Sequence, residues 1–283
     1  MHRFVLSDTI KERLMRRQGK LVSRDAIDAA RATLVVVDMQ NHFVAEGFPA
    51  EIPLAREIVP AINRLARAMR AAGGHVLWIQ TTATGAIEHW GNHHKYMLTP
   101  ERAAARLASL DESAEGFRLF PALEPQPGDL RVKKIKYSAF IPGSSDIDAQ
   151  LKSRGIDTLL VAGTATNVCC ESTARDAMML DYRVIMLSDA NATLTDEEHT
   201  ATLNSFLLFF GDVMTADEAV CRLVPVASRK RREGAERFAH LRRMTAASIA
   251  EIARYIRDET IARIVIAVIT MLSLKIWLPY WMR

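Results

Sequence analysis

Two patterns of apolar positions alternate along the first part of the chain, short continuous runs and longer helical spacings. The run TLVVVDM at residues 33–39 is rich in β-branched residues, which is typical of a strand covered on both faces. In residues 54–74 the apolar positions recur at helical spacing and a Gly-Gly pair follows, which predicts a helix and its end. These positions are Ile58, Ile62, Leu65 and Met69, followed by Gly73 and Gly74.

Four further apolar runs predict strands, at residues 75–81, 129–135, 157–163 and 182–190. A long irregular segment, residues 82–128, separates the first two of these runs, and helical patterns separate the others. Parallel neighbours need a crossover connection, which is usually a helix. The order therefore predicts an α/β domain with a mostly parallel, doubly wound sheet and helices on both faces.

Composition divides the chain into three parts. Residues 30–226 hold all the predicted strands, residues 1–29 form an N-terminal extension, and residues 227–283 form a basic linker and a hydrophobic C-terminal helix. The net charge of +4 divides into +7 for the last part and −3 for residues 1–226. Because those 226 residues show no basic stripe with interleaved aromatics, we expect no nucleic-acid partner.

The C-terminal tail allows three interpretations. Residues 261–281 form an apolar stretch of 21 positions if Arg263 and Lys275 snorkel, long enough for a membrane anchor at the cytoplasmic face. The same stretch suits a helix that packs on another subunit, or a weakly structured extension. With three cysteines and no secretory segment in the charged start, we expect a cytoplasmic protein with free thiols.

Three reactive side chains follow the carboxyl ends of predicted strands, where open parallel sheets place their sites. Asp38 closes the first strand, Lys134 lies at the end of the third, and Cys169 follows the fourth, where the next helix begins. A carboxylate, an ammonium and a thiol on one rim of a sheet suit acyl transfer.

Helical spacing separates the two adjacent cysteines. Cys170 begins an apolar stripe that faces the sheet, so we expect it in the core. Cys169 lies about a third of a turn away in the first turn, where the helix field stabilises a thiolate. Cys169 is therefore the candidate nucleophile, and the alternative is a buried apolar role. The stripe of Cys170 continues through Thr173, Ala174, Ala177 and Met178.

Three segments carry recognisable motifs: VVVDMQNHF at 35–43, VKKIKYSAF at 132–140, and residues 155–190 with the motif TNVC. Together they resemble the isochorismatase-like cysteine hydrolases, a family that includes nicotinamidases, N-carbamoylsarcosine amidohydrolases and ureidoacrylate amidohydrolases. The resemblance covers about residues 30–225 and implies a catalytic triad of Asp38, Lys134 and Cys169.

The chain departs from the family pattern at two places. His42 stands where the family commonly has an acidic residue. Lys133 and Lys136 lie close to Lys134 in the sequence and are alternative candidates for the catalytic lysine. Strand alternation sends Lys133 to the opposite face, and Lys136 lies past the strand end. The family spacing favours Lys134.

The proposed triad suggests a definite chemistry. Asp38 accepts the thiol proton, Cys169 attacks an amide or ureido carbonyl to form a thioester, and Lys134 holds the two charges in register. The resemblance further implies an oxyanion hole made by the backbone amides of Ala165 and Cys169, with a cis peptide bond between Thr164 and Ala165.

Substrate recognition is expected from the long segment 82–128 and its neighbours. Asn41, Trp90 and Tyr137 are the candidate substrate-binding residues, each with structural packing as the alternative.

Three histidines in the same segment leave a further question open. His89, His93 and His94 could bind a metal, line a substrate pocket or lie in a solvated loop. The Asp-x-His motif of the nicotinamidases is missing, so we expect no metal and no other cofactor.

The resulting expectation is an amidohydrolase that acts on a small amide or ureido compound. A vinyl ether hydrolase of the isochorismatase type, and a non-catalytic scaffold tethered to a membrane, are the alternatives. The resemblance also implies a homo-oligomer.

Overall fold

The computed structural model describes residues 1–23 and 25–227. Within this range, no helix combines the length and the apolar character that crossing a bilayer requires. The expected C-terminal helix, with its membrane-anchor and subunit-packing interpretations at residues 261–281, lies outside the described residues.

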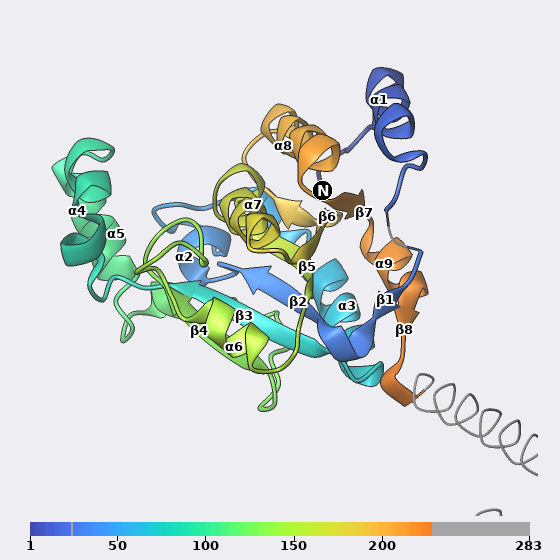
Figure 1. The fold of residues 1–283 in the computed structure, drawn as a ribbon. Helices are drawn as coiled ribbons and strands as arrows, with labels where there is room; N and C mark the ends of the chain where they lie inside the picture. The colour runs from blue at the N-terminus through green and yellow to red at the C-terminus, as the bar shows by residue number, and fades with distance from the viewer. Residues whose placement is uncertain (24, 228–283) are drawn as a thin grey trace, which may run out of the picture. The chain divides into compact units, whose positions relative to one another are not determined.

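A six-stranded parallel sheet forms the centre of the domain, in the order β4-β3-β2-β5-β6-β7 (Figure 1). The five predicted strands are confirmed, with every end within two residues of its expected position. The edge strand β7 is missing from the prediction because three residues are too few to give a recognisable apolar run. The strands are β2 (Ala32–Val37), β3 (His75–Thr81), β4 (Leu130–Lys134), β5 (Thr158–Thr164), β6 (Arg183–Ala192) and β7 (Asp212–Met214).

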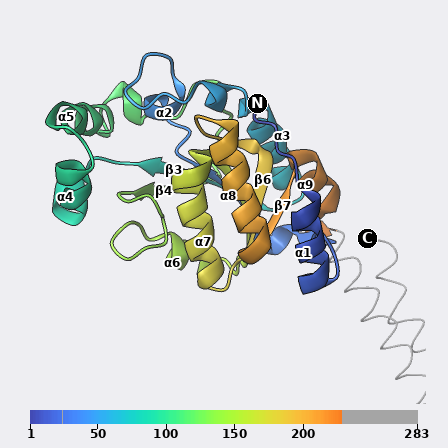
Figure 2. The same cartoon turned by 90° about the horizontal axis from the view of Figure 1, so that it is seen from above.

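Helices cover both faces of the sheet (Figure 2). Alternate residues of β2 enter the two cores, since Leu34 and Val36 belong to one apolar cluster and Val35 and Val37 to the other. A strand with both faces buried in this way has no polar side, which explains its continuous apolar run. One face carries α3 (Val59–Ala71) and α9 (Ala216–Arg222), and the other carries α6 (Ile147–Lys152), α7 (Glu171–Met179) and α8 (Asp196–Phe209).

The N-terminal segment packs on this domain. Helix α1 (Asp8–Gln18) begins after the capping hydroxyl of Ser7, contacts α8, and buries Leu14 completely in the core on that face. A short parallel pair follows, formed by β1 (Ile27–Asp28) and β8 (Leu223–Val224). Residues before the sheet therefore contribute to the hydrophobic core.

The expectation that residues 82–128 are irregular was wrong. The segment contains α4 (Ala86–Tyr96) and α5 (Pro100–Ser109), which lie beyond the arrowheads of β2 and β3 (Figure 1). No residue of α5 is buried, although its polar and apolar residues lie on opposite faces, and α4 is interrupted at Trp90, where the backbone is not helical. Apolar spacing predicts helices that bury a face, and these two helices bury little.

Candidate active site

Three strand ends bring a carboxylate, an ammonium and a thiol together. Asp38 follows β2, Lys134 ends β4, and Cys169 lies in the turn after β5. The Nζ atom of Lys134 lies 2.8 Å from Oδ2 of Asp38 and 3.5 Å from Sγ of Cys169. Asp38 and Lys134 are fully buried, and Cys169 is 5% exposed. The residues selected from the sequence therefore meet at the carboxyl edge of the sheet.

Thr81 also belongs to this cluster, although the sequence analysis missed it. Its hydroxyl accepts a hydrogen bond from Nζ of Lys134 (2.7 Å) and donates one to Oδ1 of Asp38 (3.0 Å). Thr81 ends β3 and pairs in register with Lys134, so the strand-end rule that selected Asp38 applies to it as well. Gln40 fixes the Thr81 backbone, because its side-chain amide donates to the Thr81 carbonyl (3.0 Å) and accepts from the Thr81 N–H (2.7 Å).

The three neighbouring lysines have different surroundings. Lys133 is exposed and forms an ion pair with Glu112, on the face of β4 opposite to Lys134. Lys136 donates through Nζ to the Pro142 carbonyl (3.0 Å), and its own carbonyl accepts from Lys134 (3.1 Å). Of the three, Lys134 is the lysine whose ammonium contacts Asp38 and Cys169, as strand alternation indicated.

Burial and charge set the protonation of the cluster. Burial alone lowers the pKa of Lys134, but the Asp38 carboxylate and the Cys169 sulfur outweigh it and raise the pKa above the ordinary lysine value. Burial raises the pKa of Cys169 to about 12, against the opposing effect of the Lys134 ammonium. The thiolate that the helix position favours is therefore not the resting form, and Cys169 rests as a thiol beside a charged lysine.

The turn that carries Cys169 is a π-helical turn, Thr166–Cys170, that leads directly into α7. Cys170 is fully buried in the core on the α7 face of the sheet, as the helical spacing predicted. The stripe is shorter than expected, because Met178 near the end of α7 is 37% exposed. Adjacent cysteines thus have separate environments, one beside the charged pair and one among apolar side chains.

The residues before this turn bring backbone close to the cluster. The peptide bond between Thr164 and Ala165 is cis, as the family resemblance implied. Gly163 lies against β2 with φ of 120°, and a Cβ atom there would lie 2.1 Å from the Val37 carbonyl oxygen, so only glycine fits. The N–H of Ala165 donates to no acceptor among the described residues, which leaves it available to a ligand.

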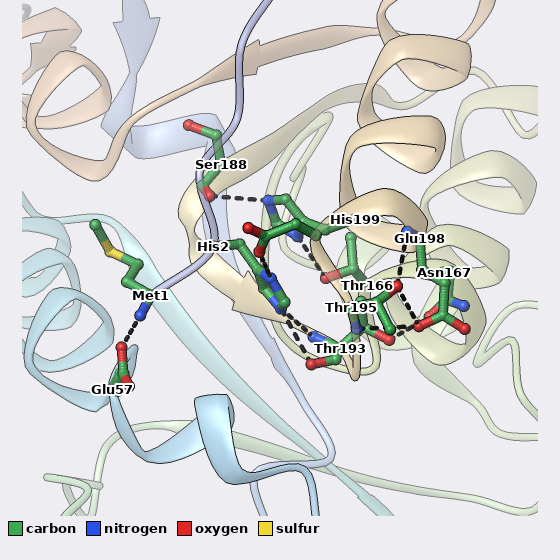
Figure 3. Close-up of polar contacts among 11 residues, drawn as sticks. Met1, His2, Glu57, Thr166, Asn167, Ser188, Thr193, Thr195, Glu198 and His199 are labelled. Atoms are coloured by element: carbon green, nitrogen blue, oxygen red, sulfur yellow. Dashed lines mark hydrogen bonds and ion pairs between the residues drawn. The ribbon is translucent and has the colours of Figure 1, made fainter.

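A buried histidine supports the same turn from behind (Figure 3). His199 Nε2 lies 3.1 Å from the Ser188 carbonyl oxygen, which only accepts, so Nε2 carries the proton and Nδ1 accepts from the Thr166 hydroxyl (3.0 Å). Burial, reinforced by His2, lowers the pKa of His199 to about 4 and keeps the ring neutral. His2 stacks on this ring with 4.6 Å between the centroids. The first residue of the turn is therefore fixed by a neutral acceptor.

Aromatic rings form one wall of the region near Cys169. Trp90 stacks on His93 at 4.0 Å between ring centroids and meets Tyr137 edge to face at 4.7 Å. Tyr137 is partly exposed, and burial together with the nearby Cys169 raises its pKa. The structure thus brings Trp90 and Tyr137 together beside the cluster, in positions where a substrate could contact them.

Asn41, the third candidate for substrate binding, is held by protein contacts. It begins the short helix α2 (Asn41–Val44), and its Nδ2 donates to the backbone and side-chain oxygens of Glu115 at 3.0 and 3.1 Å. Only Oδ1 is left without a partner among the described residues. A structural role accounts for most of its side chain.

The three histidines lie in two different surroundings. Among residues 1–23 and 25–227, no group of three or more His, Cys, Asp or Glu side chains is arranged to hold a metal ion. His93 and His94 contact each other and Trp90 through their rings, and His89 lies on the exposed side next to Glu88. Two of the histidines therefore belong to the aromatic wall.

Comparison with known proteins identifies the family. The model of the isochorismatase domain matches residues 32–218. The ureidoacrylate amidohydrolase RutB of Variovorax paradoxus (strain S110) is 35% identical over 217 residues, which cover 72% of this chain and 85% of that protein.

Solved structures give the same answer. The crystal structure of a cysteine hydrolase from Pseudomonas syringae pv. phaseolicola 1448A is 31% identical with a TM-score of 0.65, and the match covers 72% of this chain and 98% of that one. The N-carbamoylsarcosine amidase of Thermoplasma acidophilum is 25% identical with a TM-score of 0.52, over 66% of this chain and 97% of that one. These matches confirm the resemblance drawn from the sequence motifs, and the chain belongs to the isochorismatase family of hydrolases.

Proposed function

We propose that this protein is a cysteine-dependent amidohydrolase that cleaves a C–N bond in a small ureido, carbamoyl or amide compound. The observation that carries the proposal is the buried contact of Lys134 Nζ with both Asp38 (2.8 Å) and Cys169 (3.5 Å). The names of two relatives, a ureidoacrylate amidohydrolase and an N-carbamoylsarcosine amidase, support the choice of bond.

The first step joins proton transfer to nucleophilic attack. Because Cys169 rests as a thiol, it must lose its proton as it attacks, and the Asp38 carboxylate is the neighbouring base. Lys134 stays protonated and stabilises the negative charge as that charge moves from Asp38 to the sulfur and then to the carbonyl oxygen. Thr81 holds the carboxylate through Oδ1, and Oδ2, which also contacts Lys134, is the oxygen that exchanges the proton.

The second half of the cycle returns the enzyme to its starting state. The tetrahedral intermediate collapses when its C–N bond breaks, and protonated Asp38 gives its proton to the leaving amine. The acyl or carbamoyl group remains on Cys169 as a thioester. Asp38 then takes a proton from water, hydroxide adds to the thioester carbonyl, and the C–S bond breaks as the proton returns to sulfur.

Backbone N–H groups supply the remaining stabilisation. The free N–H of Ala165, together with the N–H of Cys169, is our proposal for the oxyanion hole. Neither group needs to reorganise during the reaction, since the turn is fixed by the contact of Thr166 with His199.

The adjacent cysteines provide a matched test. Ammonia release is measured across primary amides, ureido acids and carbamoyl amines with the wild type, Cys169→Ala and Cys170→Ala; a carbamate product decomposes to ammonia and carbon dioxide, so ureido compounds are included. We expect Cys169→Ala to lower turnover by about 10³-fold or more and Cys170→Ala to retain most of it.

Two outcomes would contradict the proposal. Equal loss in both variants would mean that the effect comes from packing, and the nucleophile would have to be sought elsewhere. No ammonia from any compound would favour the vinyl ether hydrolase or the non-catalytic scaffold. The expected homo-oligomer and the cytoplasmic location remain predictions.

A further inference from the structure

The start of the chain lies behind Thr166 and Asn167, the first two residues of the turn that carries Cys169 (Figure 3). The side chain of His2 is completely buried there, although the residues on either side of it are exposed. Its ring stacks on His199 with 4.6 Å between the centroids and 18° between the planes. Because burying an imidazole is costly unless its nitrogen atoms find partners, those partners indicate what the segment does at this place.

Two chains of contacts join His2 to the turn. In the first, His2 stacks on the His199 ring, whose Nδ1 accepts a hydrogen bond from the Thr166 hydroxyl at 3.0 Å. In the second, Nε2 of His2 accepts from the Thr193 N–H at 3.0 Å, and the Thr193 hydroxyl donates to Oδ1 of Asn167 at 2.6 Å. Both chains therefore end on side chains of the turn.

Asp196 fixes the orientation of the His2 ring. Its Oδ1 lies 2.6 Å from Nδ1 of His2, and since a carboxylate only accepts, Nδ1 carries a proton. In the neutral ring, Nε2 is then the acceptor for the Thr193 N–H. Nε2 also lies 3.0 Å from the Thr193 carbonyl oxygen, to which a protonated ring would donate. The contact between His2 and Thr193 is therefore kept in either protonation state.

The turn itself has an unusual backbone. The Ala165 carbonyl accepts from the N–H groups of Val168 and Cys170, both at 3.1 Å, whereas in an α-helical turn it would accept from Cys169, four residues on. Turns of this π-helical kind are rare and occur frequently at functional sites. This backbone keeps the Cys169 N–H away from the Ala165 carbonyl, as the proposed oxyanion hole requires.

We propose that His2 and His199 are a positioning pair, which holds the turn of Cys169 in the form that the oxyanion hole needs. Both rings act through the turn and not on the substrate itself. The inference rests on the proposed function, and it gives the N-terminal extension, residues 1–29, a part in the active site. Because an oxyanion hole stabilises the transition state, loss of the pair should lower kcat and leave KM nearly unchanged.

The first test removes the hydroxyl that His199 holds. Thr166→Val keeps the shape of the side chain and loses the donor, and we expect kcat on the best substrate of the panel to fall by about 10- to 100-fold with KM within about threefold. Thr166→Ser keeps the hydroxyl and should recover most of the turnover. Thr158→Val is the matched control, because it removes a buried hydroxyl at the opposite end of β5, and it should stay within about twofold of wild type.

The second test removes the contact from the N-terminal segment. His2→Ala loses the stack and both hydrogen bonds, and we expect kcat to fall by about 5- to 20-fold with KM within about threefold. His2→Phe keeps a stacked ring without nitrogen atoms, so its kcat should lie between those of His2→Ala and the wild type. Arg3→Ala changes an exposed side chain of the same segment and should stay within about twofold.

The kinetics overturn the proposal in three cases. Either Thr166→Val or His2→Ala leaves kcat unchanged, Thr166→Ser loses as much turnover as Thr166→Val, or the control Thr158→Val loses as much as both.

Amide hydrogen exchange separates this inference from the proposed function, because it needs no turnover. The full-length wild type, Thr166→Val, His2→Ala and Thr158→Val are compared by mass spectrometry. We expect peptides that cover residues 164–171 to exchange about tenfold faster in the first two variants, with the change confined to this turn and to the segments that contact His2.

Failure of the proposed function is recognised by the wild type alone. If it releases ammonia from no compound of the panel, that function fails, and exchange still decides whether the two histidines hold the turn. Unchanged exchange of residues 164–171, or faster exchange throughout the domain, would overturn the positioning pair.

Discussion

The floor and the wall of the candidate site are built in different ways. The floor, formed by Asp38, Thr81, Lys134 and Cys169, stands on the ends of three strands and on the turn after β5, and it is almost completely buried. Each polar group there has a partner from another of these segments. The wall comes from α4 and α5, together with the ring of Tyr137, and these two helices bury few side chains.

This difference separates chemistry from selection. A parallel sheet holds its strand ends in register, so Asp38, Thr81 and Lys134 keep their distances whatever α4 and α5 do. The wall depends on α4, whose backbone is kinked at Trp90, and on α5, which has no buried residue. Its side chains can therefore be substituted with little loss of fold stability. We therefore expect substitutions in the floor to change kcat and substitutions in the wall to change KM.

Replacing the central ammonium should have the largest effect. Lys134→Met removes the cation that contacts both Asp38 and Cys169, and we expect turnover to fall by about 100- to 1,000-fold in a protein that still folds. Circular dichroism and gel filtration establish folding before the kinetics are measured.

Lys133 provides the matched control for this substitution. It lies one residue away on the exposed face of β4 and pairs with Glu112, and a surface pair contributes little. Lys133→Met should therefore stay within about twofold of wild type. Comparable losses in both variants would remove the special role of Lys134.

The pH dependence of thiol labelling tests the resting state of the floor. Because the pKa of Cys169 is raised to about 12, the thiolate fraction of the free enzyme should rise about tenfold per pH unit from pH 7 to pH 9. The rate of iodoacetamide labelling, measured in Cys221→Ser, should follow this slope without a plateau. A plateau near pH 7 would show a preformed thiolate and ion pair, contrary to the effect of burial.

The smallest effects are expected in the aromatic wall. Trp90→Ala removes the ring that contacts His93 and Tyr137, and we expect KM to rise by about 3- to 10-fold with kcat within about threefold. Steady-state kinetics on the best substrate separate the two constants. A fall in kcat at constant KM would place Trp90 with the floor, and the contrast between the two regions would then fail.

Helical spacing, strand alternation and the position of residues at strand ends predict the floor from the sequence. Helical spacing distinguishes Cys169 from Cys170, and strand alternation distinguishes Lys134 from Lys133, because both rules depend on burial in a regular core. Thr81 follows from the same strand-end rule but carries no charge and no reactive group, which is why it was missed.

The wall could not be predicted in this way. Helix α5 separates its polar and apolar residues onto opposite faces, but the apolar face consists mostly of alanines and none of its residues is buried, so it gives no run of large apolar side chains in the sequence. Conversely, the sheet needs so many buried apolar residues that its strands are visible in the sequence as continuous runs.

The central claim is that Cys169 carries the substrate's acyl or carbamoyl group during turnover. The most direct measurement is intact-protein mass spectrometry after rapid acid quench of the wild type and Cys169→Ala with 3-ureidopropionate, followed by peptide mapping. We predict a mass increase equal to one carbamoyl group on the peptide that holds Cys169, and none in Cys169→Ala. Continued turnover by Cys169→Ala, or an adduct mapped to Cys170, would contradict the account.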